Sequence, residues 1–441
     1  MAPRVRSSTA PRTLVLRRTP VEKAPEPELG ADVVPKTRYT SPDFMRLESE
    51  RLWPRVWLLA GREADVPNPG DWFTFEIGPE SILVVRDRQG RLGAFFNVCL
   101  HRGNRLCEPG MGHAPSFTCL YHCWVWGTDG KLAHVPDAET FPPGALPPNL
   151  TLRPLRCETW GGFVWVNMAL DAEPLREFLG VVPEHLDPYR FEEQALVDDV
   201  TVEVDCNWKT SVDAFNEAYH IQGTHPELLE WADDVNVQID LYERHSRFIF
   251  RLGVLSPRLR PRDAIPVPMR EILLRGAGID PDAFTGTVAD VRPAVVRAMR
   301  ALGESTGVDF GALHDDQLVD DFHYTIFPNV TFNVHAQGTW LFRHRPHPSD
   351  PEKMYFDFQT YVRLPGDTPP PPRPPHRRVK DGETSLGRML DQDLYNLSRV
   401  QAGMRSRAFV GLYLSDQERR IRHHHRWIER YLFGERREHG R

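Results

Sequence analysis

The spacing of hydrophobic and polar residues divides the chain into a β-rich first part and a mixed second part. Short apolar runs cut by Gly and Asp recur between residues 57 and 168, for example at 72–77, 81–86 and 92–97. Such runs predict the strands of a small antiparallel β domain. Ahead of them, apolar residues at near-helical spacing between 37 and 60 predict a leading helix.

The second part of the chain follows a connecting segment at 170–200 and combines strand and helix patterns. A strand is expected at 200–205 and a helix after Trp208. Further strands are expected near 237–253, 322–345 and 353–364, and two amphipathic helices near 385–409 and 415–432. Runs of strands followed by helices indicate an α+β fold.

These patterns define the expected domain organisation. We expect a disordered tail at 1–36, a β domain with its leading helix at 37–168 and a second domain at 169–441. Within the second domain, 255–320 would form an insertion or lid, and the proline-rich stretch within 365–380 a surface loop. The first twenty residues hold five arginines and no acid, as a transit peptide does. The same Arg and Pro bias continues along the chain, which favours a tail.

Composition and charge narrow the classes of partner. The 441 residues are 40% hydrophobic and 26% charged, as in a soluble globular protein of two or three domains. The net charge of −7, without a basic stripe, argues against nucleic acid. No apolar run approaches the roughly 20 residues of a membrane span. The six cysteines lack the spacing of a disulfide framework, so a reducing cytoplasm is the expected location.

Two mixed pairs of cysteine and histidine carry the strongest chemical signal. Cys99-x-His101 is followed, seventeen residues later, by Cys119-x-x-His122. Zinc sites usually pair Cys with Cys and His with His. A Rieske [2Fe–2S] cluster instead takes two Cys on one iron and two His on the other. The spacing therefore favours a Rieske cluster held by these four residues.

A second group of candidate ligands lies on the helix that follows Trp208. Glu217 and His220 are three residues apart and would share one helical face. His225 would point elsewhere on a continuous helix, but Gly223 offers a stop, and unwinding there would turn His225 back toward His220. Two imidazoles facing one point predict a metal site, which a carboxylate would complete as a 2-His-1-carboxylate triad for Fe(II).

Both motifs resemble those of Rieske non-heme iron oxygenases, in particular the alpha subunits of aromatic-ring-hydroxylating dioxygenases. The similar segments are Cys-Leu-His-Arg-Gly from Cys99, Tyr-His-x-Trp from Tyr121 and the Glu-x-x-His-x-x-x-x-His-Pro pattern from Glu217. The resemblance covers about residues 40–435. It implies an N-terminal antiparallel β Rieske domain and a C-terminal catalytic domain of helix-grip type.

The resemblance also implies the third iron ligand and a bridging residue. The carboxylate would come from the late helix, where Asp393 is favoured and Asp391 is the alternative. Glu217, an aspartate in many ring-hydroxylating members, would hydrogen-bond His220 and the cluster ligand His122 of a neighbouring subunit.

The activity implied is an oxygenase reaction. Electrons from NAD(P)H would reach the cluster through a reductase or ferredoxin and pass to the mononuclear iron, where O₂ is activated beside an aromatic or other apolar substrate. The expected assembly is a homotrimer, with or without a small beta subunit. Two alternatives remain open: a monooxygenase or demethylase of an alicyclic or amine substrate, and an electron-transfer or ligand-binding protein without catalytic iron.

The remaining histidines are expected to be structural. Consecutive residues His423, His424 and His425 point about 100° apart on a helix, which predicts a solvated face. His323 and His335 would pack in the sheet, with pocket lining as the alternative. The long 255–320 stretch and the Phe-rich strand at 322–332 suggest a roomy apolar pocket.

Overall fold

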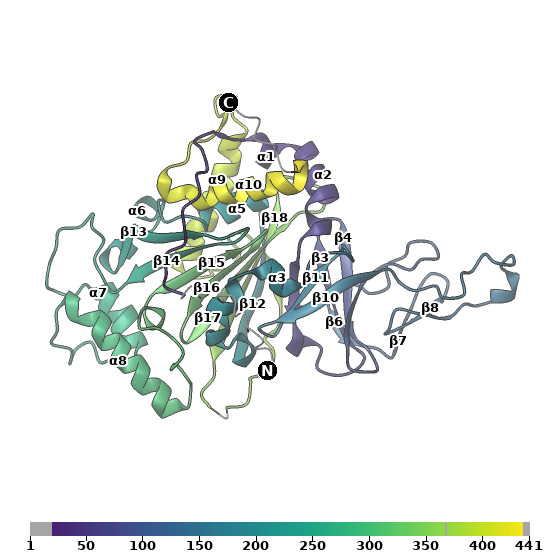
Figure 1. Cartoon of the computed structure of the whole chain (residues 1–441), viewed down its shortest axis with the longest axis horizontal. Coiled ribbons are helices and arrows are strands. Elements are labelled where there is room, and N and C mark those ends of the chain that lie inside the picture. Colours follow the sequence, from purple (N-terminus) through teal and green to yellow (C-terminus); the bar gives the residue numbers. More distant parts are fainter. Residues whose placement is uncertain (1–19, 367, 435–441) are drawn as a thin grey trace, which may run out of the picture.

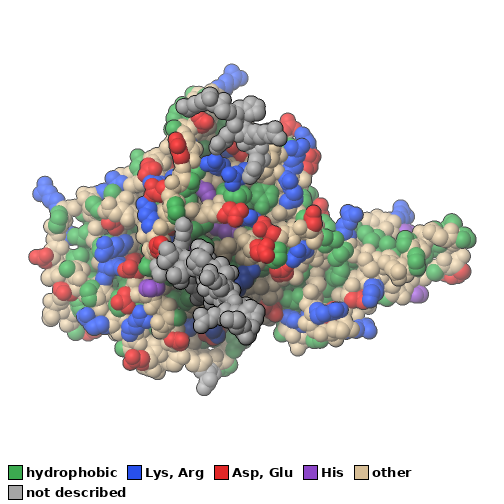
Figure 2. All heavy atoms as spheres, viewed as in Figure 1, with side chains coloured by type: hydrophobic (Ala, Val, Ile, Leu, Met, Phe, Trp, Pro, Cys, Tyr) green, Lys and Arg blue, Asp and Glu red, His purple; other side chains and the backbone are tan. Residues whose placement is uncertain are grey.

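Two β units lie side by side in the computed structural model, which describes residues 20–366 and 368–434 (Figure 1). The larger unit contains a broad sheet with helices above it, and the smaller unit ends in an arm that projects away from the body. On the face seen in Figure 2, acidic and basic side chains are interspersed along both the body and the arm. The smaller unit comes first in the chain.

The smaller unit is built from two antiparallel sheets. Its seven-stranded sheet has the order β2-β11-β10-β5-β4-β3-β6, and its three-stranded sheet the order β7-β8-β9. The bounds are β2 Leu58–Arg62, β3 Asp71–Ile77, β4 Glu80–Arg86, β5 Leu92–Phe96, β6 Met111–His113, β7 Ser116–Thr118, β8 Val125–Gly127, β9 Leu132–His134, β10 Pro154–Trp160 and β11 Phe163–Asn167. A tight turn joins β8 to β9, with Gly130 at a φ of 78° that glycine adopts without strain.

The larger unit is organised around one eight-stranded sheet of order β13-β14-β15-β16-β17-β18-β12-β19. All neighbours are antiparallel except β12 and β19, which run parallel. The bounds are β12 Gln194–Val204, β13 Ala232–Leu241, β14 Ser246–Leu252, β15 Asp321–Ile326, β16 Val330–His335, β17 Gly338–Pro346, β18 Met354–Arg363 and β19 Arg377–Lys380. The predicted strand regions are confirmed.

Helices α5, α9 and α10 gather above the broad sheet, and α7 and α8 lie at its far end (Figure 1). The bounds are α1 Thr37–Thr40, α2 Pro42–Arg51, α3 Leu175–Leu179, α4 Val182–Leu186, α5 Trp208–Ala214, α6 Ile221–Thr224, α7 Val267–Met269, α8 Val288–Thr306, α9 Arg388–Met404 and α10 Arg419–Phe433. A π-helical turn at Arg270–Leu274 extends α7. Among the described residues, no helix is both long and apolar enough to span a bilayer.

The expected leading helix is shorter than predicted. Helix α2 ends at Arg51, and the chain is already in strand β2 by Leu58. Pro54 explains the difference, since a proline disfavours helical conformation in the residue before it and supplies no backbone donor. The apolar residues after it therefore face the core from a strand.

The two units share one continuous core. Side chains of the smaller unit such as Trp160 and Phe163 pack against Phe332 of the broad sheet, with ring centroids 6.5 Å and 5.5 Å from it. Phe322 and Phe332 lie buried on this side. Because alternate residues of a strand face opposite sides, these phenylalanines face the first unit, and the residues beside them on the same strands face the cavity described below.

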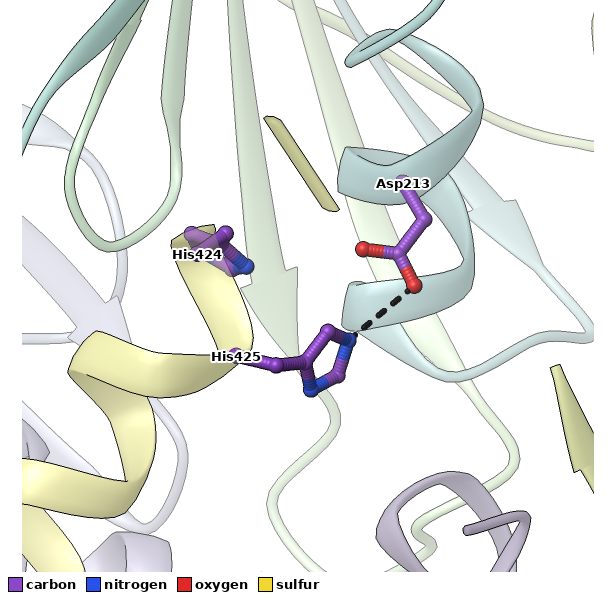
Figure 3. Close-up of side chains that lie close together, drawn as sticks. All are labelled: Asp213, His424 and His425. Atoms are coloured by element: carbon purple, nitrogen blue, oxygen red, sulfur yellow. Dashed lines mark hydrogen bonds and ion pairs between the residues drawn. The ribbon is translucent and has the colours of Figure 1, made fainter. Parts of the chain in front are cut away.

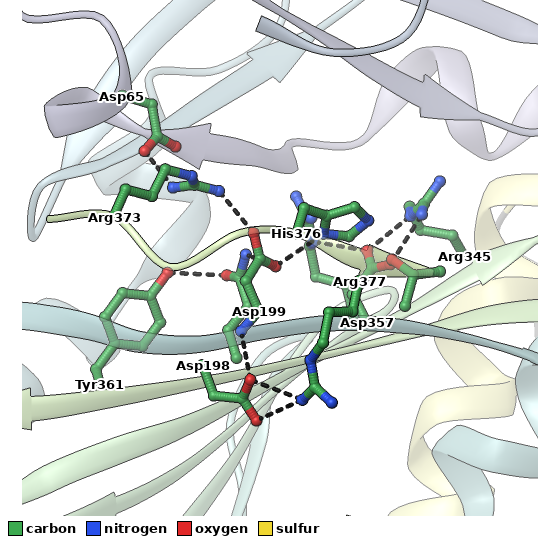
Figure 4. Close-up of polar contacts among 12 residues, drawn as sticks. Asp65, Asp198, Asp199, Arg345, Asp357, Tyr361, Arg373, His376 and Arg377 are labelled. Atoms are coloured by element: carbon green, nitrogen blue, oxygen red, sulfur yellow. Dashed lines mark hydrogen bonds and ion pairs between the residues drawn. The ribbon is translucent and has the colours of Figure 1, made fainter. Parts of the chain in front are cut away.

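The proline-rich stretch at 365–375 connects the two units on the surface (Figure 4). Arg373 forms an ion pair with Asp65 of the first unit and a second one, of 2.7 Å, with Asp199 of β12. His376 contacts the same Asp199 at 3.2 Å, just before β19 joins the edge of the sheet. The predicted surface loop thus also ties the units together.

The segment at 20–36, expected to be part of a disordered tail, makes specific contacts. The backbone N–H of Ala24 donates to Asp240 at 2.6 Å, and Arg247 donates to the carbonyl oxygens of Pro20 and Glu22. Strand β1, Val34–Pro35, then pairs with β20, Gly411–Leu412. The buried pair of Arg247 and Asp240 provides the polar partners that fix this segment. The rest of the expected tail lies outside the described residues.

A buried ion pair fixes α2 against α5. Lys209 Nζ lies 2.7 Å from Glu48 Oε1, and both side chains are inaccessible to solvent. The indole N–H of Trp208 also donates to Glu48, at 3.3 Å. Because α5 leads directly into the candidate metal ligands, this pair positions the start of the site.

Removal of one partner of this pair should destabilise the protein. Lys209→Met leaves the Glu48 carboxylate buried without a counter-charge, which costs about 3–5 kcal/mol. The double variant with Glu48→Leu removes both charges and should recover most of that loss. Chemical and thermal denaturation measure the effect. Equal stability of the single and double variants would show that the pair does not hold α2 on α5.

Candidate metal centres

Two loops of the first unit bring the predicted cluster ligands together. Cys99 and His101 lie after β5, and Cys119 and His122 lie in the connection between β7 and β8. Each loop closes on itself, because the backbone N–H of Cys99 donates to Asn104 and that of Cys119 donates to Trp124, both at 2.8 Å. Both cysteine side chains are buried.

The two imidazoles of these loops face each other. The rings of His101 and His122 are 4.5 Å apart at their centroids, and His101 stacks on Trp124 at 4.7 Å and 4°. The Nδ1 atom of His101 is buried and has no hydrogen-bond partner. A buried imidazole nitrogen without a partner requires a ligand, and a metal ion is one that satisfies it.

The two thiols lie in different electrostatic surroundings. Burial raises the pKa of the Cys99 thiol. Although burial acts in the same direction at Cys119, the backbone N–H groups of Tyr121 and His122 donate to its sulfur and lower its pKa. Amide donors directed at a sulfur stabilise the thiolate that a metal binds. Two thiols, two imidazoles and an unpartnered nitrogen therefore fit a [2Fe–2S] cluster with two Cys and two His.

The second candidate centre is reached through a break in the chain after α5. The predicted continuous helix is wrong here, because α5 ends at Ala214 and the short helix α6 begins at Ile221. Asn216 accounts for the break, since its side chain is buried and accepts a 2.6 Å hydrogen bond from Thr325 of β15. The predicted stop near Gly223 is confirmed, and His225 follows the end of α6.

The structure brings His220, His225 and Asp393 to one point. His225 Nε2 lies 2.9 Å from Asp393 Oδ1, and His220 Nε2 lies 3.5 Å from the same oxygen. The two imidazole rings are 5.1 Å apart. One ligand-capable atom from each residue lies within 4.8 Å of the others, as a single metal ion requires.

The outer nitrogens of both imidazoles determine their tautomers. His220 Nδ1 lies 2.6 Å from Glu217 Oε1, and His225 Nδ1 lies 2.8 Å from Gln392 Oε1. Carboxylate and amide oxygens only accept, so each Nδ1 carries a proton and each Nε2 is the ring nitrogen left to bind a metal ion. This arrangement is the one by which outer partners orient metal-binding histidines.

A divalent cation would balance the negative charge of this group of side chains and would bind its nitrogen and oxygen atoms. Although burial disfavours its charge, hydrogen bonds that the His220 imidazole donates to the Asp393 and Glu217 carboxylates raise the pKa of His220 to about 10. The same imidazoles lower the pKa of Asp393 despite its burial. Without a metal, a proton therefore lies between the imidazole nitrogen of His220 and the Asp393 carboxylate, which would otherwise both be acceptors. Two neutral His and one carboxylate fit an Fe(II) centre with open positions.

Asp393 and Asp391 have different roles in α9. Asp393 is buried and faces the histidines. Asp391 instead accepts hydrogen bonds from Ser385 Oγ at 2.5 Å and from the backbone of Leu386 at 2.8 Å, at the start of the helix. Asp391 therefore ties the segment before the helix to its first turn and lies outside the site.

The same face of α9 is tied to the start of α5. Gln401, two turns after Asp393, accepts hydrogen bonds from the backbone N–H of Asn207 at 2.9 Å and from Thr210 Oγ1 at 3.1 Å. Gln392 and Gln401 were not predicted as functional residues. Glutamine is common on any helix, so its presence alone does not indicate a function. The sequence could have pointed to these two residues only through their positions, one residue before and eight residues after Asp393.

The three consecutive histidines of α10 are buried, so their predicted solvated face is wrong. Two of them approach Asp213 of α5 (Figure 3). His425 Nε2 lies 3.2 Å from Asp213 Oδ2 and 2.8 Å from Tyr39 Oη, while His424 Nε2 donates to the Pro328 carbonyl at 2.7 Å. Neighbouring segments cover helix α10 on several sides, which is why all three histidines are buried. His425 connects the helix to α5 through its contact with Asp213.

A cavity of about 670 Å³ opens onto His220, His225 and Asp393. Its walls are mainly apolar and aromatic, including Trp231 and Phe342, and α8 with the preceding turn forms one side. The 255–320 stretch therefore supplies part of the cavity wall. His323 and His335 line the cavity as well as belonging to the sheet, so packing alone does not describe them.

Comparison with known proteins agrees with both centres. The protein-family model of the Rieske [2Fe-2S] domain matches residues 56–150 of the sequence. The protein-family model of the ring hydroxylating alpha subunit (catalytic domain) matches residues 191–434. The chain is 30% identical over 209 residues to the glycine betaine monooxygenase oxygenase subunit of Pseudomonas aeruginosa, covering 45% of this chain and 47% of that protein. It is 27% identical to the biphenyl 2,3-dioxygenase alpha subunit of Rhodococcus jostii, covering 80% and 74%. The match spans about half the length of several of these curated relatives.

Solved structures with the same fold include members of two reaction types. The quaternary ammonium Rieske monooxygenase CntA superposes with a TM-score of 0.65 at 20% identity, covering 93% of this chain and 99% of that one. Naphthalene 1,2-dioxygenase superposes with a TM-score of 0.65 at 19% identity, covering 94% and 95%. The α+β fold expected from the sequence, with a β Rieske domain ahead of the catalytic domain, is confirmed.

Iron analysis of two aspartate variants tests the mononuclear centre. The reconstituted protein should contain three iron atoms per chain, two in the cluster and one held by the histidines. Asp393→Ala should contain two, because the remaining imidazoles lose their charged partner. The matched control Asp391→Ala should keep three and lose about 1 kcal/mol of stability with its hydrogen bonds to Ser385 and Leu386. If Asp391→Ala contained two iron atoms and Asp393→Ala three, Asp391 would be the ligand.

The cluster ligands are tested by a pair of cysteine variants. Cys119→Ser removes one thiolate and should abolish the visible absorption of the cluster. Cys123→Ser, four residues away on an exposed side chain, should leave the spectrum unchanged. Loss of the spectrum in both variants, or in neither, would contradict the assignment of Cys119.

Proposed function

The chain belongs to the family of ring-hydroxylating alpha subunits, and on this premise we propose that it is a Rieske non-heme iron oxygenase. It hydroxylates an aromatic or other largely apolar organic substrate with O₂ and with electrons that originate in NAD(P)H. A single observation carries the proposal. The Nε2 atoms of His220 and His225 and the Asp393 carboxylate converge where a largely apolar cavity begins.

The residues of this chain prepare both centres for that chemistry. Cys99, His101, Cys119 and His122 would hold the cluster, and His220, His225 and Asp393 the mononuclear iron. When bound, these groups supply single-electron transfer and a centre for O₂ activation. Glu217 and Gln392 hold the Nδ1 protons, which keeps each Nε2 directed at the iron position. The aromatic walls exclude water and place the substrate beside the open positions.

We infer that electrons pass between subunits of a trimer. Leu120 and Tyr121, at the tip of the second cluster loop, are 88% and 55% exposed. Large exposed apolar residues beside a redox centre are typical of a contact surface. In a cyclic trimer, His122 of the partner subunit would face Glu217, which already holds His220. A small beta subunit would add to this assembly without changing the route.

The electron donor would be a reductase, directly or through a ferredoxin. A reducing, cytoplasmic location agrees with the six free cysteines of the structure. A role limited to electron transfer or ligand binding leaves the converging His and Asp side chains unexplained. We therefore favour the oxygenase.

Monooxygenation, including demethylation of an amine, is the second candidate reaction. The 30% identity to a glycine betaine monooxygenase subunit, over 45% of the chain, favours it. Similarity to a benzene 1,2-dioxygenase alpha subunit, 35% over 212 residues, supports dioxygenation equally. The products distinguish these reactions.

Turnover under isotopically labelled O₂ tests the proposed function. The holoenzyme with a reductase, ferredoxin and NADH is incubated with a panel of aromatic, alicyclic and amine substrates. Oxygen from O₂ should appear in at least one product, as two atoms for dioxygenation and one for monooxygenation. If NADH is consumed and cluster oxidation occurs without labelled product from any class, the oxygenase proposal is wrong.

The bridging role of Glu217 predicts a selective defect. Glu217→Gln keeps an oxygen that accepts from His220 Nδ1, so both metal centres should remain loaded. Loss of the negative charge should slow product formation by at least roughly tenfold relative to cluster reduction. Glu230→Gln, an acid paired with Arg262 on the same segment, serves as control and should retain wild-type rates. Stopped-flow spectra of the cluster with product analysis measure both steps. If Glu217→Gln formed product as fast relative to cluster reduction as the wild type does, Glu217 would not be the bridge between the two centres.

A further inference from the structure

The floor of the cavity carries a polar strip in an otherwise apolar surrounding. The strip consists of four side chains on the two central strands: Asp321 and His323 of β15, and Asn333 and His335 of β16. Residues two apart on a strand share a face, so both pairs point into the cavity. The mechanism proposed above uses none of them.

The register of the sheet places aromatic residues on both sides of this strip. His323 lies opposite Asn333 in the pairing of β15 with β16. On the outer strands, Phe248 is the partner of His323 and Trp340 is the partner of Asn333. A ligand on the floor would therefore contact polar atoms at its centre and aromatic rings at its flanks.

A buried arginine fixes the protonation of His323. Both terminal nitrogens of Arg420 lie 3.2 Å from His323 Nδ1. A guanidinium only donates, so Nδ1 accepts and the neutral ring carries its proton on Nε2. Burial, followed by the charge of Arg420, holds the pKa of His323 well below its usual range. His323 Nε2 is buried and has no hydrogen-bond partner.

The amide nitrogen of Asn333 is a second donor of the strip without an acceptor. Asp321 Oδ1 makes no hydrogen bond but lies 3.6 Å from His335 Nε2. Burial and the neighbouring Asp320 raise the pKa of Asp321 to about 8. The strip therefore places two unpartnered N–H donors, on His323 and Asn333, at the cavity wall.

The charges around the cavity disfavour a cationic ligand at this place. Arg420 lies directly behind His323 and has no carboxylate within hydrogen-bond distance among the described side chains. Two other acids of the cavity wall are engaged, because Asp320 pairs with Arg292 and Glu227 with Arg388. An acceptor oxygen satisfies the donors and faces the positive charge.

We propose that the substrate combines an apolar, ring-sized body with an acceptor oxygen, a carboxylate or carbonyl, that binds the Nε2–H of His323 and the amide of Asn333. This proposal deepens the function proposed above and rests on it. A purely apolar substrate would displace water from these donors and leave them unpaired, which costs roughly a tenfold loss of affinity for each donor. Phe248 and Trp340 would then hold the body of the substrate.

Binding of four matched probes to the iron-loaded enzyme tests the proposal. The probes are naphthalene, 2-naphthoate, 2-acetylnaphthalene and (2-naphthylmethyl)trimethylammonium, and their Kd values are measured by calorimetry in the absence of O₂. At least one oxygen-bearing probe should bind tenfold or more tighter than naphthalene and the ammonium. The naphthoate and acetyl arms distinguish a carboxylate from a carbonyl. Equal affinity for all four, tightest binding of the ammonium, or no binding would overturn the proposal.

Variants locate the preference on the polar strip. His323→Phe and Asn333→Leu should each reduce the advantage of the oxygen-bearing probe about tenfold and change the affinity for naphthalene by less than threefold. His323→Gln keeps an N–H donor and should restore part of the advantage. The control Phe250→Leu, on the aromatic flank, should weaken all probes by a similar factor. An advantage that survives in both His323→Phe and Asn333→Leu would overturn the assignment.

Two measurements separate this proposal from the proposed function. Iron content and thermal unfolding of each variant establish that the fold and the metal centres are intact before binding is compared. An enzyme that incorporates labelled oxygen but shows no preference among the probes contradicts only the polar strip. A chain that binds the oxygen-bearing probe but holds no mononuclear iron contradicts only the oxygenase.

Discussion

The structure depends on one arrangement of charge: the Nε2 atoms of two imidazoles and a carboxylate face one another in a buried place. The Nδ1–H of His225 donates to Gln392 Oε1, and its Nε2 lies only 2.9 Å from Asp393 Oδ1. Such a contact persists only if a proton or a cation lies between the two atoms. The rest of the catalytic unit keeps these groups together.

Several buried polar contacts serve that purpose. Gln401 connects the helix that carries Asp393 to the start of α5, and the pair of Lys209 and Glu48 holds α5 against α2. Asn216, bonded to β15, ends α5 early and allows the chain to turn toward Glu217. These contacts all converge on the short segment between α5 and α6. The geometry of the metal site is therefore determined by elements far apart in the sequence.

Much of this architecture was predictable from local patterns. The Cys and His spacing identified the cluster loops, and strand patterns located the sheets, because both signals are contained within short segments. Features that depend on tertiary contacts were missed. The histidines of α10 are buried because segments far from them in sequence cover that helix, which a local pattern cannot show. The phenylalanines of the 322–332 region face the first unit while His323 and Asn333 face the cavity. Strand periodicity predicts two faces but not which neighbour each face meets. Ligation by Asp393 and the bridge at Glu217 stay predictions.

The central claim is that a single chain carries both a Rieske cluster and a separate mononuclear iron. The Mössbauer spectrum of the wild-type protein enriched in ⁵⁷Fe and reduced with dithionite tests it most directly. The account predicts that two thirds of the iron belongs to the coupled cluster pair and one third to an isolated high-spin ferrous centre. A spectrum in which all the iron belongs to the cluster pair would contradict it.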